Sequence, residues 1–175
     1  CLENGMGGGL SAVSNSVRIH NRLVRERPDL AEALYQPYPY DFRGEQPAGG
    51  PSFYSLPVFT EWEGRLFVRC IPPYIWASQR HAEAPRLTDL QREALQAVEQ
   101  LAEEPDNHVL MELRAGDIQF INNFHVLHGR TAYVDDRPTG RVRHLKRLWL
   151  ETDELGSRPG DGLHVGPPAG HENGQ

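Results

Sequence analysis

The sequence predicts one compact domain that is mainly β with flanking helices. The 175 residues are 38% hydrophobic and 9% aromatic, which is enough apolar material for a sizeable core. Runs rich in β-branched and aromatic residues recur in the middle and in the last third of the chain. Between them lie stretches in which apolar residues repeat at helical spacing. Strands and helices are therefore both expected.

The first fifty residues predict a glycine loop, two helices and a long connection. CLENGMGGG suits a strand end that runs into a loop with positive φ angles. Apolar residues at helical spacing predict a helix over residues 14–27, and Pro28 ends it or begins a second helix through Leu34. Residues 36–51 are rich in Pro, Tyr and Gly, which favours a long irregular loop of the kind that often forms a lid.

The central part of the chain predicts a hairpin, then a helix, then further strands. SFYSLPVF and GRLFVRCI have strand composition and flank the turn-like EWEG. Thr88 and Gln91 form a capping box, and the helix that follows ends at Pro105. Three β-like runs come next: VLMEL, DIQFINN and RHLKRLWLE.

Charge and composition narrow the class of partner. A net charge of -6 argues against a nucleic-acid partner and favours a small molecule. No apolar run approaches the roughly 20 residues that span a bilayer, and no secretory signal is visible, so we expect a cytoplasmic protein. Cys1 and Cys70 form no metal-type spacing and are expected to be reduced. Residues 153–175 lack large apolar side chains and are expected to form a disordered tail after a domain of residues 1–152.

Two arginines near the end of the domain are candidates for anion binding. On a strand, Arg143 and Arg147 would share one face, and burying two unpaired charges there would be very costly. Both therefore face solvent, or both face an anion. A guanidinium group matches a carboxylate in bidentate geometry, which makes a dicarboxylate ligand plausible.

His128 is a candidate metal ligand. Imidazole is a good ligand for Fe(II), although most histidines are surface or hydrogen-bonded residues and a single one is a weak signal. His125 lies three residues earlier, so on a strand it would point to the opposite face and could not easily share a metal with His128.

In order along the chain, GDIQFINNFHVLHGRTAY and RHLKRLWL resemble the C-terminal signature of the taurine dioxygenase-like family of Fe(II)- and 2-oxoglutarate-dependent enzymes. The GGG loop, NRLVRERPDL, LPVF and LTDLQREAL resemble the same family more loosely, so the resemblance covers about residues 1–150. It implies a double-stranded β-helix, or jelly roll, that lacks its N-terminal portion here.

The resemblance also implies a role for individual residues. His128 takes the position of the distal iron ligand, and Arg143 that of the arginine that pairs with the carboxylate of 2-oxoglutarate. Arg147 falls where relatives can place a second arginine against an anionic substrate, and Asn123 occupies the family's Asn position, where it would support the strand. The implied reaction consumes dioxygen, decarboxylates 2-oxoglutarate to succinate and oxidises a C–H bond of a small, anionic or zwitterionic substrate.

One departure from the family pattern is serious. The two remaining iron ligands form a His-x-Asp or His-x-Glu pair upstream of the glycine loop, and no such pair precedes that loop here. His81 and Glu83 match the spacing but lie in an expected surface connection. We therefore expect that an N-terminal segment carrying the pair is missing. The alternative is a non-catalytic jelly-roll module that binds a carboxylate or a protein, and a homo-oligomer stays open.

Overall fold

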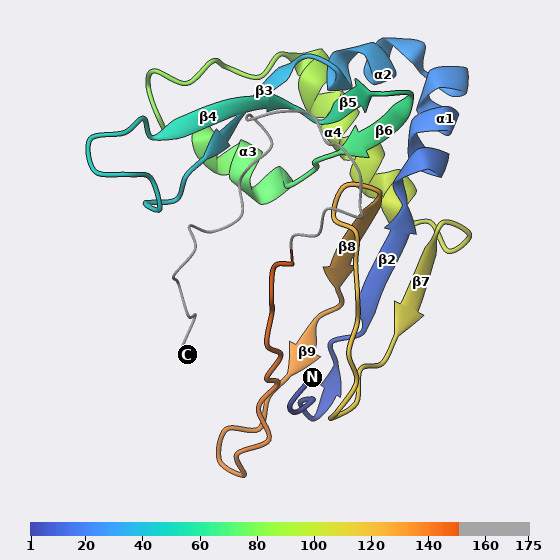
Figure 1. The fold of residues 1–175 in the computed structure, drawn as a ribbon, viewed down its shortest axis with the longest axis vertical. Coiled ribbons are helices and arrows are strands. Elements are labelled where there is room, and N and C mark those ends of the chain that lie inside the picture. The colour runs from blue at the N-terminus through green and yellow to red at the C-terminus, as the bar shows by residue number, and fades with distance from the viewer. Residues whose placement is uncertain (151–175) are drawn as a thin grey trace.

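A computed structural model describes residues 1–150 as nine strands and four helices. In Figure 1 the helices and β3 to β6 form the upper half, and β2, β7, β8 and β9 extend below them. The expectation of a mainly β chain with flanking helices is confirmed at this level. The predicted tail, residues 153–175, lies outside the described residues. The bounds are β1 Gly7–Gly8, β2 Ser11–Asn15, α1 Ser16–Glu26, α2 Pro28–Leu34, β3 Pro37–Asp41, β4 Phe53–Pro57, β5 Phe59–Trp62, β6 Arg65–Val68, α3 Pro72–Ser78, α4 Asp89–Glu103, β7 His108–Met111, β8 Val126–Arg130 and β9 Tyr133–Val134.

The helices begin where the capping residues predict. Asn15 caps α1 by accepting a hydrogen bond from the backbone N–H of Arg18, and Pro28 occupies the first turn of α2, where no N–H is needed. The capping box of Thr88 and Gln91 starts α4. Both predicted helices near the N-terminus and the predicted helix before Pro105 are thus confirmed, whereas α3 is a helix that the sequence pattern did not predict.

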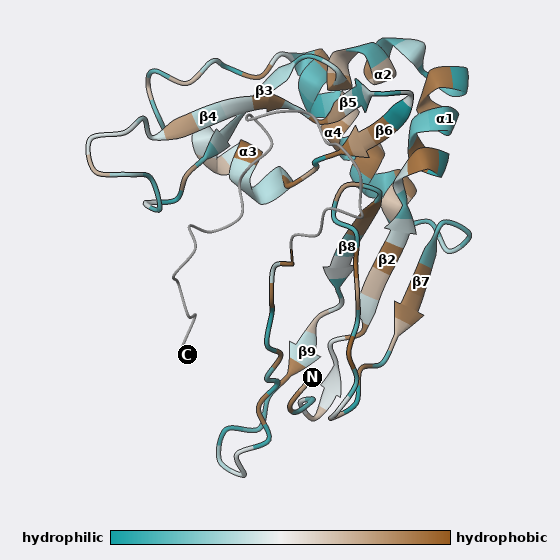
Figure 2. Cartoon of the chain, in the orientation of Figure 1, coloured by the Kyte–Doolittle hydropathy of each residue, from teal (hydrophilic) through white to brown (hydrophobic). Residues whose placement is uncertain are grey.

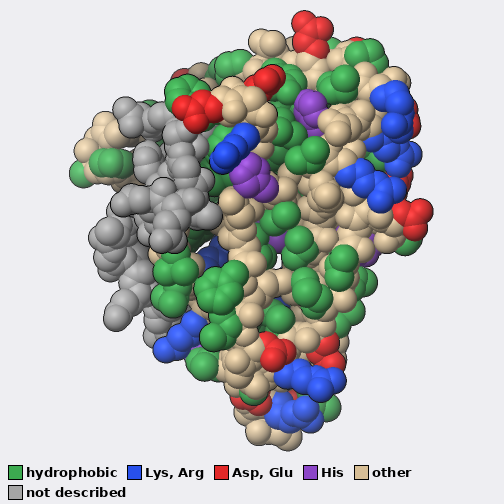
Figure 3. All heavy atoms as spheres, turned by 45° about the vertical axis from the view of Figure 1, so that its right-hand side comes forward, with side chains coloured by type: hydrophobic (Ala, Val, Ile, Leu, Met, Phe, Trp, Pro, Cys, Tyr) green, Lys and Arg blue, Asp and Glu red, His purple; other side chains and the backbone are tan. Residues whose placement is uncertain are grey.

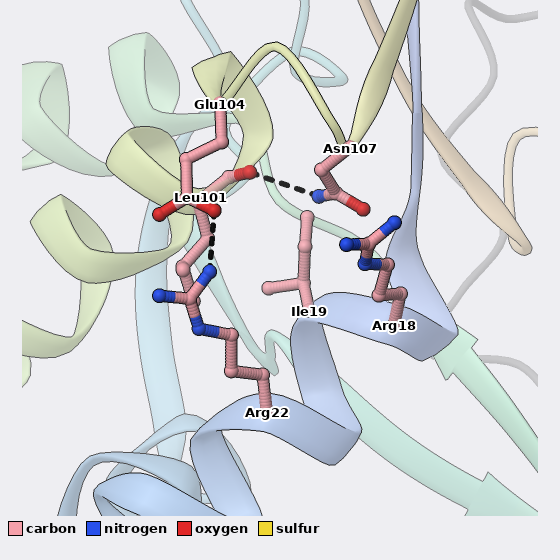
Figure 4. Close-up of a pocket in the computed structure, with 6 residues that line it drawn as sticks. All are labelled: Arg18, Ile19, Arg22, Leu101, Glu104 and Asn107. Carbon is pink, nitrogen blue, oxygen red and sulfur yellow. Dashed lines mark hydrogen bonds and ion pairs between the residues drawn. The ribbon is translucent and has the colours of Figure 1, made fainter.

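The end of α4 is tied to α1 by polar contacts around a small hollow (Figure 4). Arg22 on α1 forms an ion pair with Glu104, and the side-chain amide of Asn107 donates to the carbonyl of Leu101 at 2.8 Å. The hollow between them has a volume of only about 10 Å³, which is the size of one water. It is a packing junction and cannot hold a ligand.

The predicted loop over residues 36–51 is wrong in its first part. Residues 37–41 form β3, which pairs antiparallel with β4 so that Tyr38 lies opposite Leu56 and Tyr40 opposite Tyr54. Both Tyr38 and Tyr40 are fully buried, and their burial outweighs the low strand propensity of the two prolines. Tertiary packing therefore overrides local composition here.

The hairpin exists, but it is shorter than predicted. The run SFYSLPVF divides into β4, which pairs with β3, and β5, which pairs with β6. Glu63 and Gly64 form the turn with φ angles of 50° and 70°, the positive values that a two-residue hairpin turn requires.

The lower half consists of small antiparallel sheets. β2 lies between β7 and β8, with Val13 opposite Val109 on one side and His128 on the other, and β1 pairs with β9. The VLMEL strand is confirmed as β7. DIQFINN and RHLKRLWLE are not strands within residues 1–150, where the latter run makes only a bridge between His144 and Glu3. The described sheets do not close into a barrel.

DIQFINN and RHLKRLWLE pair with no strand of the three-stranded sheet, whose two edges in the described residues are β7 and β8. Hydrophobic residues of the lower half are correspondingly exposed, among them Phe120 at 80% and Val134 at 64%. Figure 2 shows hydrophobic segments along β7 and β8, and Figure 3 shows hydrophobic side chains gathered on the surface of the lower half. A strand needs a neighbour to satisfy its backbone groups, so composition alone could not make these runs into strands.

The main core lies in the upper half. It is formed by apolar faces of the helices together with β3 to β6, and includes Ile19, Leu34, Tyr38, Phe59, Ile75 and Leu95. Both cysteines are free, as expected. Among residues 1–150, no helix combines the length and the apolar character that crossing a membrane requires.

Candidate functional site

The glycine loop lies directly against the segment that follows β8. Gly8 has a φ of 73°, and a Cβ at this position would lie 2.1 Å from the carbonyl oxygen of Ala132. The N–H of Gly9 donates to the same carbonyl at 2.9 Å. Only glycine allows the two backbones to approach this closely. The loop and β9, more than 120 residues apart in the sequence, thus form one unit.

Arg143 is held by this unit. Its guanidinium Nη2 donates to the carbonyl of Gly9 at 3.2 Å, and its backbone N–H donates to the carboxylate of Asp135 at 2.8 Å. The guanidinium carbon lies 5.6 Å from the centre of the Tyr133 ring, within range of a cation–π interaction. Two contacts therefore fix the half-buried side chain, and a third holds the backbone of the same residue.

One donor of this guanidinium group has no acceptor. The Nε atom of Arg143 is buried and makes no hydrogen bond with any residue among 1–150. Leaving a buried charged donor unsatisfied costs roughly 1–3 kcal/mol or more. A carboxylate is the acceptor that best matches the planar donors of a guanidinium group. The observation fits an anionic ligand at Arg143.

Arg130 and Tyr133 extend the cluster, and the sequence pattern did not single them out. The Arg130 guanidinium lies 4.3 Å from the centre of the Tyr133 ring, so the two arginines share one aromatic ring. The available signal was the spacing in HGRTAY, because Arg130 lies two residues after His128 on the same strand and so shares its face. An aromatic residue between two arginines also favours stacking of both cations.

His128 lies on β8, opposite Val13 of β2. The pKa of His128 is lowered, first by loss of hydration around its ring and second by the positive charge of Arg147. The residue nevertheless keeps an exposed surface. A lowered pKa favours the neutral imidazole at pH 7, which has the lone pair that a metal ion needs. The structure also brings Arg147 within electrostatic range of His128.

The described residues do not by themselves form a metal site. Within residues 1–150, no group of three or more His, Cys, Asp and Glu side chains is arranged to hold a metal ion. His81 lies instead beside the buried carboxylate of Asp41, at 3.4 Å, and Glu83 is exposed. Burial by itself would raise the pKa of Asp41. The backbone N–H of Arg43 and the side chains of His81 and Arg80 outweigh this effect, so the pKa of Asp41 is lowered overall. His81 therefore lies beside a buried carboxylate, away from His128 and the arginine cluster.

The remaining candidates are placed less closely. Arg147 is exposed and does not lie on a strand, so the expected alternation that would align it with Arg143 is wrong. Asn123 is half-buried, and its side chain makes no hydrogen bond to another residue of the described part. Its neighbour Asn122 accepts from the backbone N–H of Phe124 at 3.1 Å and so shapes the turn before β8. The role of Asn123 stays a prediction.

Comparison with known proteins identifies the family. The family model described as "Taurine catabolism dioxygenase TauD, TfdA family" matches residues 1–149, a stretch that contains the glycine loop, His128 and both arginines. The chain belongs to this family. The resemblance inferred from the ordered motifs is thereby confirmed.

Two curated relatives are similar over most of the chain. FR-33289 synthase of Streptomyces rubellomurinus is 33% identical over 155 residues, which cover 87% of this chain and 46% of that protein. The taurine hydroxylase-like protein SAT17 of Stachybotrys chartarum is 33% identical over 167 residues, which cover 93% of this chain and 42% of that protein. The chain thus spans less than half the length of these two relatives.

Proposed function

We propose that this chain forms part of an Fe(II)- and 2-oxoglutarate-dependent oxygenase. Its substrate would be a small anionic or zwitterionic molecule, of which one C–H bond is hydroxylated or otherwise oxidised. Family membership supports the reaction class. The observation that carries the co-substrate assignment is the buried, unpartnered Nε of Arg143.

Each residue of the cluster would have a distinct task. Arg143 would donate hydrogen bonds to a carboxylate of 2-oxoglutarate, since its guanidinium group is already oriented by Gly9 and Tyr133 and its backbone is held by Asp135. Arg147 would orient an anionic group of the substrate and, through its charge, keep His128 neutral. Asn123 would support the turn into β8.

The iron would be held only in part by this chain. His128 fits one ligand position because its pKa is lowered and its ring stays accessible. Since residues 1–150 contain no group of three ligands, the other two would come from outside this part. Iron, when bound, supplies the oxidising chemistry with dioxygen and 2-oxoglutarate.

The complete protein would have a double-stranded β-helix fold and would act in the cytoplasm. The three-stranded sheet with open edges at β7 and β8 would be part of a double-stranded β-helix completed by further strands. The acidic composition and the small-molecule chemistry are consistent with a cytoplasmic enzyme that has no nucleic-acid partner.

A second candidate function is a non-catalytic module that binds a carboxylate. The observation that favours it is the single candidate iron ligand among the described residues, set beside a well-formed arginine cluster. Such a module would bind 2-oxoglutarate or a similar anion and form no succinate in any length of the protein.

The test of the co-substrate assignment follows the Nε–H signals of the arginines by ¹H–¹⁵N NMR while 2-oxoglutarate is added to the chain. We expect the Arg143 signal to shift saturably, because its Nε–H gains an acceptor, and we expect propionate to shift it less. Arg114→Gln is the matched control, since Arg114 is exposed and the Nε of its guanidinium group is 4.0 Å from the carboxylate of Glu112. An unchanged Arg143 signal at saturating 2-oxoglutarate would remove Arg143 from the co-substrate site.

A further inference from the structure

Gln119 is a half-buried residue in an otherwise exposed run, and its side chain lies against the three-stranded sheet. Residues 114–118 and Phe120 are exposed on either side of it. The Oε1 atom of Gln119 accepts a hydrogen bond from Oγ of Ser11 at 2.8 Å, and Nε2 donates to Sδ of Met111 at 3.9 Å. Ser11 and Met111 are directly opposite each other on β2 and β7 (Figure 1). The amide therefore rests on one face of the sheet.

The two contacts decide which end of the Gln119 amide carries the hydrogens. A hydroxyl group can donate or accept, whereas a thioether sulfur can only accept, so the NH₂ group faces Met111 and the carbonyl oxygen faces Ser11. One N–H of this group is directed at sulfur, which is a weak acceptor. No residue among 1–150 accepts a hydrogen bond from the other N–H. Gln119 thus has a donor to offer to a ligand.

The face on which the amide rests is the one that carries His128. Arg130 lies directly opposite Ser11, and His128 is two residues before Arg130 on β8, so the three side chains project to the same side of the sheet. Ser11 and His128 are diagonal neighbours, a pair that is separated by about 7–8 Å in antiparallel sheets. The other face packs on α4, where Oγ of Ser14 donates to the carbonyl of Ala102 at 2.7 Å. The amide therefore lies beside the candidate iron ligand.

Two residues of one short segment hold the arginine and the amide. The carbonyl of Gly9 accepts from Nη2 of Arg143 at 3.2 Å, and Ser11, two residues later, donates to Gln119 at 2.8 Å. Residues two apart in a chain are separated by at most about 7 Å. The guanidinium group and the amide, each one hydrogen bond from its anchor, can therefore contact the same small ligand. The two carboxylates of a five-carbon dicarboxylate span a similar length.

We propose that Gln119 determines specificity for the length of the co-substrate, because its amide donates a hydrogen bond to the carboxylate of 2-oxoglutarate that Arg143 does not bind. This inference rests on the proposed function, in which Arg143 holds one end of the same molecule. The other end then lies on the face that carries His128, where Ser11 and Met111 have already oriented the amide. A donor in a fixed position recognises one separation of the two carboxylates and not a shorter one.

The experiment follows the side-chain N–H signals of Gln119 and the Nε–H signal of Arg143 by ¹H–¹⁵N NMR in the full 175-residue chain. Both 2-oxoglutarate and glutarate, which have five carbons, should shift the two sets of signals saturably and with the same dissociation constant. Malonate, which is two carbons shorter, should shift the Arg143 signal and leave the Gln119 signals in place. If 2-oxoglutarate shifts Arg143 but not Gln119, the role of Gln119 is overturned and the co-substrate assignment stands. If it shifts neither, both assignments are overturned.

Substitutions of Gln119 test the donor itself. Gln119→Leu removes the amide and should weaken glutarate binding about tenfold or more, because a hydrogen bond to a charged group is lost, while malonate binding stays unchanged. Gln119→Glu keeps an acceptor for Ser11 but has no N–H group, so it should bind glutarate no better than the leucine variant. Gln96→Leu, at an exposed glutamine of α4, is the matched control and should change neither affinity. An unchanged ratio of glutarate affinity to malonate affinity in the Gln119→Leu variant would reject the assignment.

Discussion

A Cβ atom at Gly9 would lie only 2.7 Å from Nε of Arg143, so the absence of a side chain at one residue makes room for the guanidinium group of the other. The two residues are 134 positions apart, and the Gly9 carbonyl also accepts a hydrogen bond from Nη2 of Arg143. The third glycine of the GGG motif is thus part of the proposed anion site. Its backbone supplies an acceptor, and its missing side chain supplies space.

Gly9→Ala should therefore destabilise the fold and displace Arg143. The φ angle of 66° is unfavourable for alanine, and together with the steric clash we expect a loss of about 1–3 kcal/mol in the free energy of unfolding. Urea unfolding and the Arg143 Nε–H signal measure the two effects.

Two glycines provide controls for this substitution. Gly44 has a φ of 85° but nothing within 4 Å of an added Cβ, so Gly44→Ala should cost stability without moving the Arg143 signal. Gly7 also has open space and no positive φ, so Gly7→Ala should have little effect. If Gly9→Ala left the Arg143 signal in place, the close approach of the two residues would be disproved.

Tyr133→Leu should loosen both arginines that contact the ring. Losing two partly exposed cation–π interactions should cost about 1–2 kcal/mol in the free energy of unfolding and weaken 2-oxoglutarate binding. Tyr133→Phe keeps the ring and should retain both properties. Equal losses in the two variants would show that the hydroxyl group, and not the ring, is what matters.

The lowered pKa of His128 should depend on Arg147. In the Arg147→Gln variant, NMR titration should show a higher pKa for His128, but one still below the usual value, because loss of hydration is the larger cause. The folded state binds this proton less readily than the unfolded state. The contribution of His128 to stability is therefore fully present above the unfolded pKa of about 6.5 and is lost as the pH falls below it towards the folded pKa.

Measuring the free energy of unfolding at pH 7.5 and at pH 5.5 checks that stability falls as the pH is lowered. Wild type should lose more stability on acidification than His128→Asn, which cannot titrate at this position. An unchanged His128 pKa in the Arg147→Gln variant would mean that the two side chains do not interact in solution.

Turnover should require residues beyond those described here. The chain alone, supplied with Fe(II), ascorbate and 2-oxoglutarate, should form succinate only at background level, because His128 is a single ligand. A longer form that spans the full length of the relatives should be active, and His128→Ala in that form should abolish the activity.

His81→Ala in the longer form is the matched control and should retain activity, since His81 lies beside Asp41. Robust succinate formation by the 175-residue chain would instead make His81 and Glu83 ligands. Activity that survives His128→Ala would remove His128 from the iron site.

Local signals in the sequence determined three of the four helices and the candidate residues. Asn15, Pro28 and Thr88 set helix starts because capping is a short-range interaction that needs only neighbouring residues. His128 and Arg143 could be chosen because the order of motifs along the chain carries the family resemblance, and the matched region confirms the family.

The tertiary structure alone decided which segments pair and how Arg143 is held. Residues 37–41 became a strand because pairing with β4 buries Tyr38 and Tyr40, while residues 143–150 have strand composition but no continuous partner among residues 1–150. The contacts of Arg143 with Gly9 and Tyr133 join segments that no sequence window contains. Strand pairing and guanidinium placement are long-range interactions, so their energy depends on the partner and not on the segment itself.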